Sequence, residues 1–288
     1  MLKIGIVPNH TKKNADVVLK RVVKFYQGKN VEIILPRESA EKYGYEQLGK
    51  DNFFAINMDL VVTIGGDGTL LNACRKVAVR NIPVCGINIG RLGFLADIEL
   101  NELESKLTKI IENDYHIEER LMLVGIVNRA GQMHCAGTAI NDVVVTKGGV
   151  SRMLNLGLSI DDSLVKNYQA DGIIVSTATG STAYSLSAGG PIINPRVKVL
   201  LITPICPHTL NARPMIIAEE EAVRIKVAAS HRDIVLTFDG QDSCSILPDD
   251  EVIVRKSPIA AQIIKFSDTN YYQTMRTKLW RGSEICRI

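Results

Sequence analysis

Short apolar runs alternate with helical patterns over residues 2–113. Consecutive apolar residues predict buried strands, whereas apolar positions that recur every three or four residues predict amphipathic helices. Strands that alternate with helices are typical of a parallel sheet with helices on its faces, so this part predicts a Rossmann-like α/β domain. The first helix has Asn14 as its predicted cap and Gly28 just past its end. The predicted strands are 2–7, 31–35, 60–64 and 83–87, and the predicted helices are 14–27, 69–80 and 99–113.

The pattern changes at about residue 115, where the apolar runs become short, rich in β-branched residues and bounded by turns. One helical pattern interrupts them at 181–188, and another follows at 270–279. Many short strands with so little helix predict a β-rich sandwich. The predicted strands are 123–127, 139–145, 154–160, 173–176, 199–203, 223–227, 234–238 and 252–254.

Two domains are therefore expected in this chain of 288 residues. The α/β domain is predicted to cover 1–100 and the β-sandwich 101–265, with the C-terminal segment 266–288 returning to the first domain. Ligands of parallel sheets bind beyond the carboxyl ends of the strands, so the turn after strand 60–64 is a candidate site.

Composition narrows the class of protein. The hydrophobic fraction of 46% and the charged fraction of 23% are ordinary for a globular protein, and the net charge is only +3. No Lys/Arg block calls for a nucleic-acid partner, and no apolar run approaches the ~20 residues of a membrane helix. The N-terminus resembles a first strand rather than a signal peptide, and six scattered cysteines favour free thiols, so a cytoplasmic protein is expected.

The most informative segment is Thr63–Leu70, which reads Thr-Ile-Gly-Gly-Asp-Gly-Thr-Leu. Its glycines let a ligand approach the backbone, and the N-terminus of the helix that follows favours phosphate. The charge of Asp67 would repel phosphate, so this carboxylate is expected to handle a hydroxyl or a metal. An ordinary Asp-Gly turn that leads into a helix is the alternative interpretation.

Two further segments carry candidate chemistry. Asn141-Asp142 begins an apolar run, and an amide beside a carboxylate can bind the two vicinal hydroxyls of a ribose, although polar pairs also simply begin strands. In the stretch 167–191, an Asp-Gly turn precedes a strand, a loop rich in Ser, Thr and Gly, and a short helix. So many small hydroxyl residues favour a ligand site over a purely structural loop.

Several familiar signatures are absent from the sequence. It contains neither the dinucleotide fingerprint G-x-G-x-x-G nor the phosphate-binding pattern G-x-x-x-x-G-K-[ST]. The nucleophile elbow G-x-S-x-G is missing as well. These gaps weaken the case for a dehydrogenase, a P-loop enzyme or an acyl hydrolase.

Together the three segments resemble the NAD kinase family. Gly65-Gly66-Asp67-Gly68-Thr69 is similar to its glycine–aspartate motif, which lipid kinases and some sugar kinases share. Asn141-Asp142 is similar to its Asn–acidic pair, and Asp171–Pro191 to its long and highly specific signature. Further similar stretches are Gly90–Leu95 and Pro207–Pro214, so the resemblance spans nearly all of the chain from about residue 60.

The resemblance implies an enzyme that phosphorylates the 2′-hydroxyl of the adenosine ribose of NAD to give NADP. ATP or another phosphoryl donor would be used with a divalent cation, expected to be Mg²⁺. The phosphates rather than protein side chains are expected to hold that ion. The resemblance also implies an α/β N-terminal domain, a β-sandwich C-terminal domain and a homodimer or homotetramer.

The resemblance also implies roles for individual residues. Asp67 would be the catalytic base that accepts the proton of the 2′-hydroxyl. The implied phosphate-donor loop is Gly65, Gly66, Gly68 and Thr69. The implied NAD-binding residues are Asp67, Gly68, Asn141, Asp142, Arg152, Gln169, Asp171, Thr182, Ala183, Tyr184, Ser185, Leu186, Ser187 and Gln241.

One position departs from the family pattern. Gln169 stands where relatives often carry Arg or Lys, so Arg152 is a candidate to balance the pyrophosphate charge, with an exposed arginine on a strand as the alternative. Gln241 matches a ligand-side position, although glutamine is also common in turns. A lipid kinase and a catalytically silent NAD(P) sensor are the competing functions; the first would need a membrane-facing surface, and the second would dispense with Asp67.

Overall fold

The computed structural model of the chain describes residues 1–90, 93–149, 152–268 and 270–279. Arg91 and Leu92 of the Gly90–Leu95 stretch, residues 280–288 of the returning segment and Cys286 lie outside the described residues. The chain forms two compact units. Unit 1 is Met1–Glu119 with the described part of Ala261–Ile288, and unit 2 is Arg120–Ala260.

The boundary between the units differs from the expected one after residue 100. It lies after Glu119, because helix α4 (Leu103–Ile111) belongs to unit 1. The apolar face of this helix, which includes Leu103, Leu107 and Ile110, is fully buried in the same core as strands of the first sheet. The periodicity at 99–113 predicted this helix as part of the α/β alternation, but the expected boundary after residue 100 cuts through that range.

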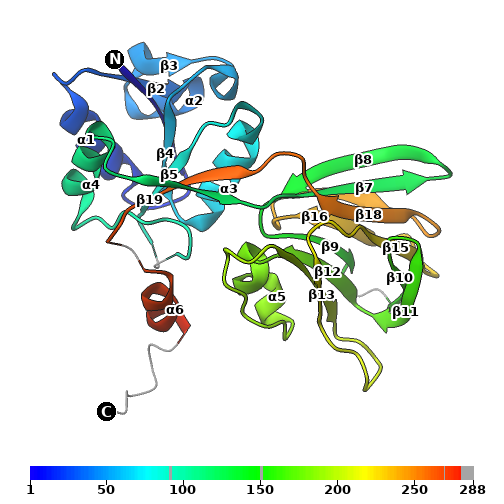
Figure 1. Cartoon of the computed structure of the whole chain (residues 1–288). Helices are drawn as coiled ribbons and strands as arrows, with labels where there is room; N and C mark the ends of the chain where they lie inside the picture. The colour runs from blue at the N-terminus through cyan, green and yellow to red at the C-terminus, as the bar shows by residue number, and fades with distance from the viewer. Residues whose placement is uncertain (91–92, 150–151, 269, 280–288) are drawn as a thin grey trace, which may run out of the picture. The chain divides into compact units, whose positions relative to one another are not determined.

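Unit 1 is built on a seven-stranded sheet with the order β3-β2-β1-β4-β5-β19-β6 (Figure 1). The pairs from β3 to β19 are parallel. Strand β4 is buried along its whole length, as expected for a central strand covered on both faces. The strands are β1 (Leu2–Pro8), β2 (Val31–Pro36), β3 (Gly49–Lys50), β4 (Leu60–Gly65), β5 (Val84–Asn88), β6 (His116–Arg120) and β19 (Ala261–Lys265).

Helices α1, α3 and α4 bury their apolar stripes within unit 1, whereas the C-terminal helix Tyr271–Leu279 has no buried residue. Helices α1 and α4 contact each other, whereas α3 packs on β4, β5 and β19. Asn14 is the N-cap residue of α1, as predicted, but it has φ 68° and its side chain makes no capping hydrogen bond. The α-helices are α1 (Ala15–Tyr26), α2 (Arg37–Tyr43), α3 (Asp67–Val77), α4 and α6 (Tyr271–Leu279), and 3₁₀ turns cover Glu46–Leu48, Phe53–Ala55 and Ala78–Arg80.

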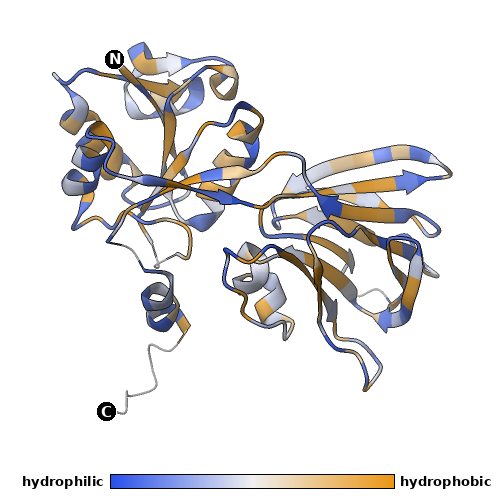
Figure 2. Ribbon diagram, in the orientation of Figure 1, coloured by the Kyte–Doolittle hydropathy of each residue, from blue (hydrophilic) through white to orange (hydrophobic). Residues whose placement is uncertain are grey.

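Unit 2 consists of two six-stranded antiparallel sheets that share one apolar core. Figure 2 shows hydrophobic residues concentrated along the strands and hydrophilic residues at the turns. The first sheet has the order β11 (Ser163–Ala170), β10 (Leu154–Ile160), β15 (Val223–Ala228), β18 (Glu251–Lys256), β7 (Leu123–Arg129) and β8 (Gln132–Ala139). The second has the order β14 (Met215–Ala218), β13 (Val199–Ile205), β12 (Gly172–Thr177), β9 (Asp142–Lys147), β16 (Ile234–Phe238) and β17 (Asp242–Ile246).

Among the described residues of unit 2, 120–149 and 152–260, one segment is helical. A 3₁₀ turn covers Thr179–Thr182, and the short helix α5 (Tyr184–Ser187) follows it directly. The helical pattern at 181–188 therefore predicted a real helix, although α5 is shorter than expected. The helical segment follows the buried strand β12.

Candidate functional site

The glycine turn joins β4 to α3 at the carboxyl edge of the parallel sheet. A Cβ on Gly65 would lie only 2.2 Å from Oγ1 of Thr69, so a side chain at this position would collide with the helix. The Thr69 hydroxyl in turn accepts a hydrogen bond of 2.9 Å from Nδ2 of Asn9, which follows β1. Glycine is therefore required at 65 because Thr69 of α3, which Asn9 holds in place, packs directly against the turn.

Gly66 differs from Gly65 because packing does not require it to be glycine. A Cβ here would meet no described atom within 4 Å, and its backbone (φ −135°, ψ −170°) is extended. Its carbonyl oxygen accepts the N–H groups of Thr69 at 3.0 Å and Leu70 at 3.2 Å. The open backbone at Gly66, beside a helix N-terminus, is the part of the turn that suits a phosphate group.

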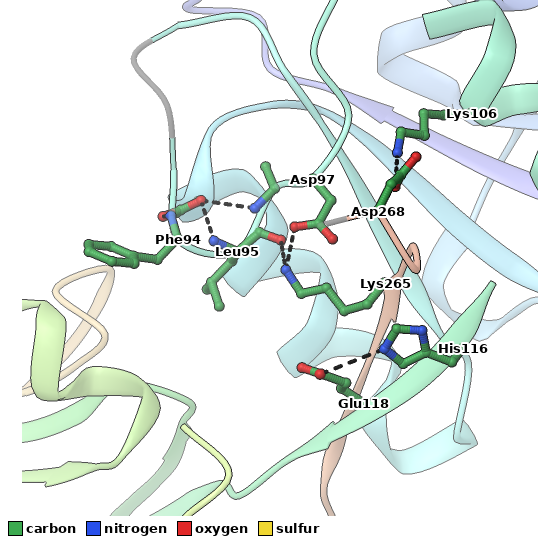
Figure 3. A network of polar contacts seen from close by, with 10 residues as sticks. Phe94, Leu95, Asp97, Lys106, His116, Glu118, Lys265 and Asp268 are labelled. Atoms are coloured by element: carbon green, nitrogen blue, oxygen red, sulfur yellow. Dashed lines mark hydrogen bonds and ion pairs between the residues drawn. The ribbon is translucent and has the colours of Figure 1, made fainter. Parts of the chain in front are cut away.

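Asp67 is the first residue of α3, and backbone donors hold its carboxylate in place. Oδ2 accepts the Phe94 N–H at 2.7 Å, and Oδ1 accepts the N–H groups of Leu95 and Ala96, each at 3.2 Å (Figure 3). A Cβ on Gly93 would lie 1.9 Å from Oδ1, so the loop can approach the carboxylate only with glycine at this position.

The bound carboxylate of Asp67 retains capacity for a ligand. An ionised carboxylate offers about four acceptor positions, and the three N–H donors use three of them. The side chain keeps 27% of its surface exposed, with Nζ of Lys278 on α6 at 3.9 Å from Oδ2. Asp67 can therefore accept a hydrogen bond from an incoming hydroxyl without leaving its loop.

Unit 2 presents the second candidate group at the start of β9. The carboxylate of Asp239 accepts the N–H groups of Ile140, Asn141 and Asp142 at 2.7–3.2 Å. Asp239 has φ 52°, in a turn that continues to Gln241. The main chain of the Asn141–Asp142 pair is therefore fixed from one side by the hairpin between β16 and β17.

The carboxyl group of Asp142 is buried, with 4% of the residue exposed. Burial, and then the negative charge of Asp239, raises its pKa to about 7, and a backbone hydrogen bond from Tyr184 opposes this shift only in part. A carboxyl group that titrates near neutral pH beside an open turn is typical of a functional site.

The segment 179–191 is held in place by its own hydroxyl groups. Oγ of Ser185 lies 2.8 Å from Oγ1 of Thr203, and Ser181 bonds main-chain groups of Ala178 and Ile193. Ser187 and Tyr184 are exposed, the latter at 46%. The predicted ligand residues Thr182, Ala183, Tyr184, Ser185, Leu186 and Ser187 thus lie together next to Asp142, although the Ser185 hydroxyl is engaged inside the unit.

Asp171 and Gln169 lie at the far end of β12 from Asn141, although the pKa of Tyr184, raised first by burial, also rises through the charges of both Asp142 and Asp171. Asp171 precedes β12 and pairs with Nζ of Lys147 at 3.1 Å, whereas Asn141 accepts the Thr177 N–H at the other end of the strand. Six residues at about 3.3 Å each separate the two ends by roughly 20 Å. Gln169 is exposed on β11 near Asp171. One ribose therefore cannot contact both Asp171 and the Asn141–Asp142 pair of the same subunit.

Arg152 and Gln241 are placed differently. Arg152 precedes β10 rather than lying on a strand; its side chain is exposed and its carbonyl oxygen is bonded to His231 Nε2 at 2.7 Å. Gln241 lies in the turn of Asp239, whose carboxylate binds the Asn141 amide. The structure therefore brings Gln241 to the neighbourhood of the ribose candidates.

Three side chains that shape these groups were missed by sequence reasoning. Asp239 binds the amides around Asn141, Lys147 neutralises Asp171, and Lys265 binds the loop that holds Asp67. Asp239 carried a signal, because it forms an Asp-Gly pair directly after an apolar strand. The lysines carried none, since their partners are distant in sequence.

Comparison with known proteins identifies the family. The protein-family model of the ATP-NAD kinase N-terminal domain matches residues 4–115, and that of the ATP-NAD kinase C-terminal domain matches residues 140–266. The chain belongs to the NAD kinase family. A NAD kinase of Heliobacterium modesticaldum is 42% identical over 282 residues, covering 98% of this chain and 100% of the relative. A NAD kinase of Moorella thermoacetica is 41% identical, covering 98% of this chain and 90% of the relative.

Solved structures confirm the predicted fold class. Yeast NADH kinase complexed with NADH superposes with a TM-score of 0.90 at 24% identity, covering 100% of this chain and 90% of the other, a likeness of fold alone. The NAD kinase from Archaeoglobus fulgidus in complex with ATP has a TM-score of 0.75 at 25% identity, covering 96% of this chain and 99% of the other. The predicted NAD kinase membership, α/β domain and β-sandwich are therefore confirmed.

Two features are absent from residues 1–90, 93–149, 152–268 and 270–279. Within these residues, His, Cys, Asp and Glu side chains form no group of three or more that could hold a metal ion. None of the helices in the described part of the chain is both long and apolar enough to cross a membrane.

Proposed function

We propose that this NAD kinase family member transfers a phosphoryl group from ATP to the 2′-hydroxyl of the adenosine ribose of NAD, giving NADP. The observation that carries the proposal is the Asp67 carboxylate, which three backbone N–H groups orient at the open glycine turn. Phosphoryl transfer requires mainly positioning and charge stabilisation, and the turn offers both.

Each candidate group has a part in this reaction. Asp67 accepts the proton of the 2′-hydroxyl, a role worth roughly 10²- to 10⁴-fold in rate. The open backbone at Gly66 receives the donor phosphates at the start of α3. Asn141 and Asp142 bind the ribose, because an amide and a carboxylate together satisfy two vicinal hydroxyls.

A homo-oligomer accounts for the separation between Asp171 and the Asn141–Asp142 pair. Strand β11 is the outer strand of its sheet, carries Gln169, and leaves Leu164 at 67% and Val165 at 42% exposed. Exposed apolar residues on an outer strand favour association with another chain. We therefore propose a homodimer or homotetramer in which this edge brings Gln169 and Asp171 to the site of a second subunit.

The divalent cation is proposed to arrive with the donor phosphates. Mg²⁺ commonly binds through substrate phosphates with few protein ligands, and the described residues contain no ready-made cluster of three metal-binding side chains. When bound, the ion would offset phosphate charge; the chain's own contribution is to orient the hydroxyl and the donor. A cytoplasmic location is proposed as well, because the five cysteines within the described residues are free thiols.

A coupled assay that consumes NADP, supplied with ATP, Mg²⁺ and NAD, tests the function. The wild-type protein should form NADP, and Asp67→Asn should lower kcat at least ~100-fold while NAD still binds. A loss smaller than about tenfold would refute the general-base role. No NADP from either protein, with NAD binding intact, would indicate a sensor, and phosphorylation of lipid instead of NAD would indicate a lipid kinase.

A further inference from the structure

Lys265 is a buried cation whose partners lie in the loop that holds Asp67. It ends β19, the strand that pairs with β5, and only 8% of the residue is exposed. Its Nζ donates to the carbonyl oxygen of Leu95 at 3.0 Å and forms an ion pair with Asp97 (Figure 3). A buried lysine needs such partners, because an unpaired charge in the interior is costly.

The Leu95 carbonyl and the Ala96 N–H belong to the same peptide group. Lys265 binds the oxygen end of this group, and the nitrogen end donates to Oδ1 of Asp67 at 3.2 Å. A cation on the carbonyl oxygen draws electron density from the amide and strengthens its N–H as a donor. One peptide plane therefore connects the ammonium group to the carboxylate.

We propose that Lys265 is a positioning residue for Asp67, acting through the Leu95–Ala96 peptide group. The inference rests on the proposed function, because it assigns Lys265 to the orientation of the base that accepts the ribose proton. Lys265 fixes the plane and the polarisation of the peptide group. The Ala96 N–H of this peptide group fixes Oδ1 of Asp67, and the position of Oδ2 is then set by the plane of the carboxylate.

Lys106 on α4 provides a matched control within unit 1. It is also buried, with 2% exposed, and it also pairs with an acidic residue, Asp268 of the C-terminal segment. Its Nζ lies over the ring of Phe266 at 4.7 Å from the centroid. Loss of Lys265 removes a cation from the largely buried Asp97, whereas Asp268, whose side chain is 49% exposed, keeps Lys109 at 3.2 Å, so Lys106→Met should lower stability less than Lys265→Met. Only Lys265 binds the peptide group that donates to Asp67.

The first experiment compares steady-state kinetics of Lys265→Met, Lys265→Arg and Lys106→Met. Lys265→Met should lower kcat about tenfold, the factor equivalent to ~1.4 kcal/mol of transition-state stabilisation. Its KM for NAD should change less than about twofold, because the residue orients the base rather than the substrate. Lys265→Arg should restore most of the rate, since guanidinium also donates to a carbonyl, and Lys106→Met should keep kcat.

A double-mutant cycle tests whether the effect passes through Asp67. In the Asp67→Asn background, Lys265→Met should change the residual kcat by less than about twofold, because residues that act as a unit are not additive. An independent readout is the amide resonance of Ala96 in protein labelled with ¹⁵N-alanine, recorded without substrates. Lys265→Met should shift it, and Lys106→Met should leave it in place.

The outcomes separate this proposal from the proposed function. If the wild-type protein forms NADP and Lys265→Met keeps its kcat, or loses it equally with and without Asp67, the positioning role is wrong. If the wild-type protein forms no NADP, the proposed function fails, and the Ala96 resonance still decides whether Lys265 acts on this peptide group. Should Lys265→Met fail to fold, Lys265→Met with Asp97→Asn removes both charges and allows the same measurements.

Discussion

Replacing the carboxyl group of Asp142 by an amide should stabilise the protein above neutral pH while weakening NAD binding. The side chain is buried next to the negative charge of Asp239, and its pKa rises from 3.8 to about 7. Ionisation of Asp142 in the folded state is therefore opposed by its surroundings. The amide oxygen introduced by Asp142→Asn would still accept the Tyr184 N–H, and it carries no charge.

The magnitude follows from the difference in pKa between the folded and unfolded states. A folded-state pKa above the unfolded value makes a contribution that is fully present below about pH 4 and is lost as the pH rises through about 7. A shift of about three units at ~1.4 kcal/mol each corresponds to an upper value of ~4 kcal/mol. About 3 kcal/mol of this should be lost between pH 4.5 and pH 8, and Asp142→Asn should abolish the loss.

The assay measures the free energy of unfolding of wild type and Asp142→Asn at several pH values by urea denaturation. Hydrogen exchange of the β9 and β12 amides assigns the change to unit 2. The difference between the free energies of unfolding of the two proteins at each pH removes the contribution of the titratable groups that they share. The control is Asp162→Asn, whose side chain is 100% exposed and should leave the pH dependence unchanged. Equal pH dependence in wild type and Asp142→Asn would refute the buried, destabilised carboxylate.

Four further predictions concern the two glycines near Asp67, the metal and the assembly. Gly93→Ala should cost ~1–3 kcal/mol of stability and lower kcat, because its Cβ would displace Asp67; differential scanning calorimetry and kinetics measure both. Gly66→Ala should change stability by less than ~0.5 kcal/mol yet raise the KM for ATP. EDTA should abolish NADP formation and leave the melting temperature unchanged, and a fall in melting temperature would indicate a structural metal. Mixed oligomers of Asp67→Asn and Asp171→Asn should form NADP, although neither variant alone does so. Each variant assayed separately is the control.

The outcome for unit 2 shows which strands a sequence reveals. Each of the eight strands predicted there occupies an interior position in one of the two sheets. The four outer strands, β8, β11, β14 and β17, were not predicted. Interior strands must bury apolar side chains, and this produces the run of β-branched residues that sequence reasoning recognises. Outer strands such as β8 remain largely exposed, so their composition resembles that of loops.

The candidate site divides in the same way. The turn of Asp67 was found because its chemistry is local, within a few residues of one strand end. The donors that bind this carboxylate come from Phe94, Leu95 and Ala96, which follow 27–29 residues later and act through their backbone. Every residue except proline has the same backbone N–H group, so no pattern of side chains in the sequence predicts which of these groups bind Asp67. The need for glycine at 93 becomes clear only from the structure, where a Cβ at this position would collide with the Asp67 carboxylate.

The two central aspartates show how surroundings distinguish identical side chains. Asp67 is partly exposed, and its oxygens are occupied by N–H donors that stabilise a negative charge. Asp142 is enclosed, and a second carboxylate disfavours its ionisation. The first arrangement suits a group that meets a hydroxyl from outside and accepts its proton. The second suits a group that becomes fully charged only when ligand hydroxyls enclose it. Because environment rather than residue type separates such roles, the two carboxyl groups can serve one reaction without exchanging functions.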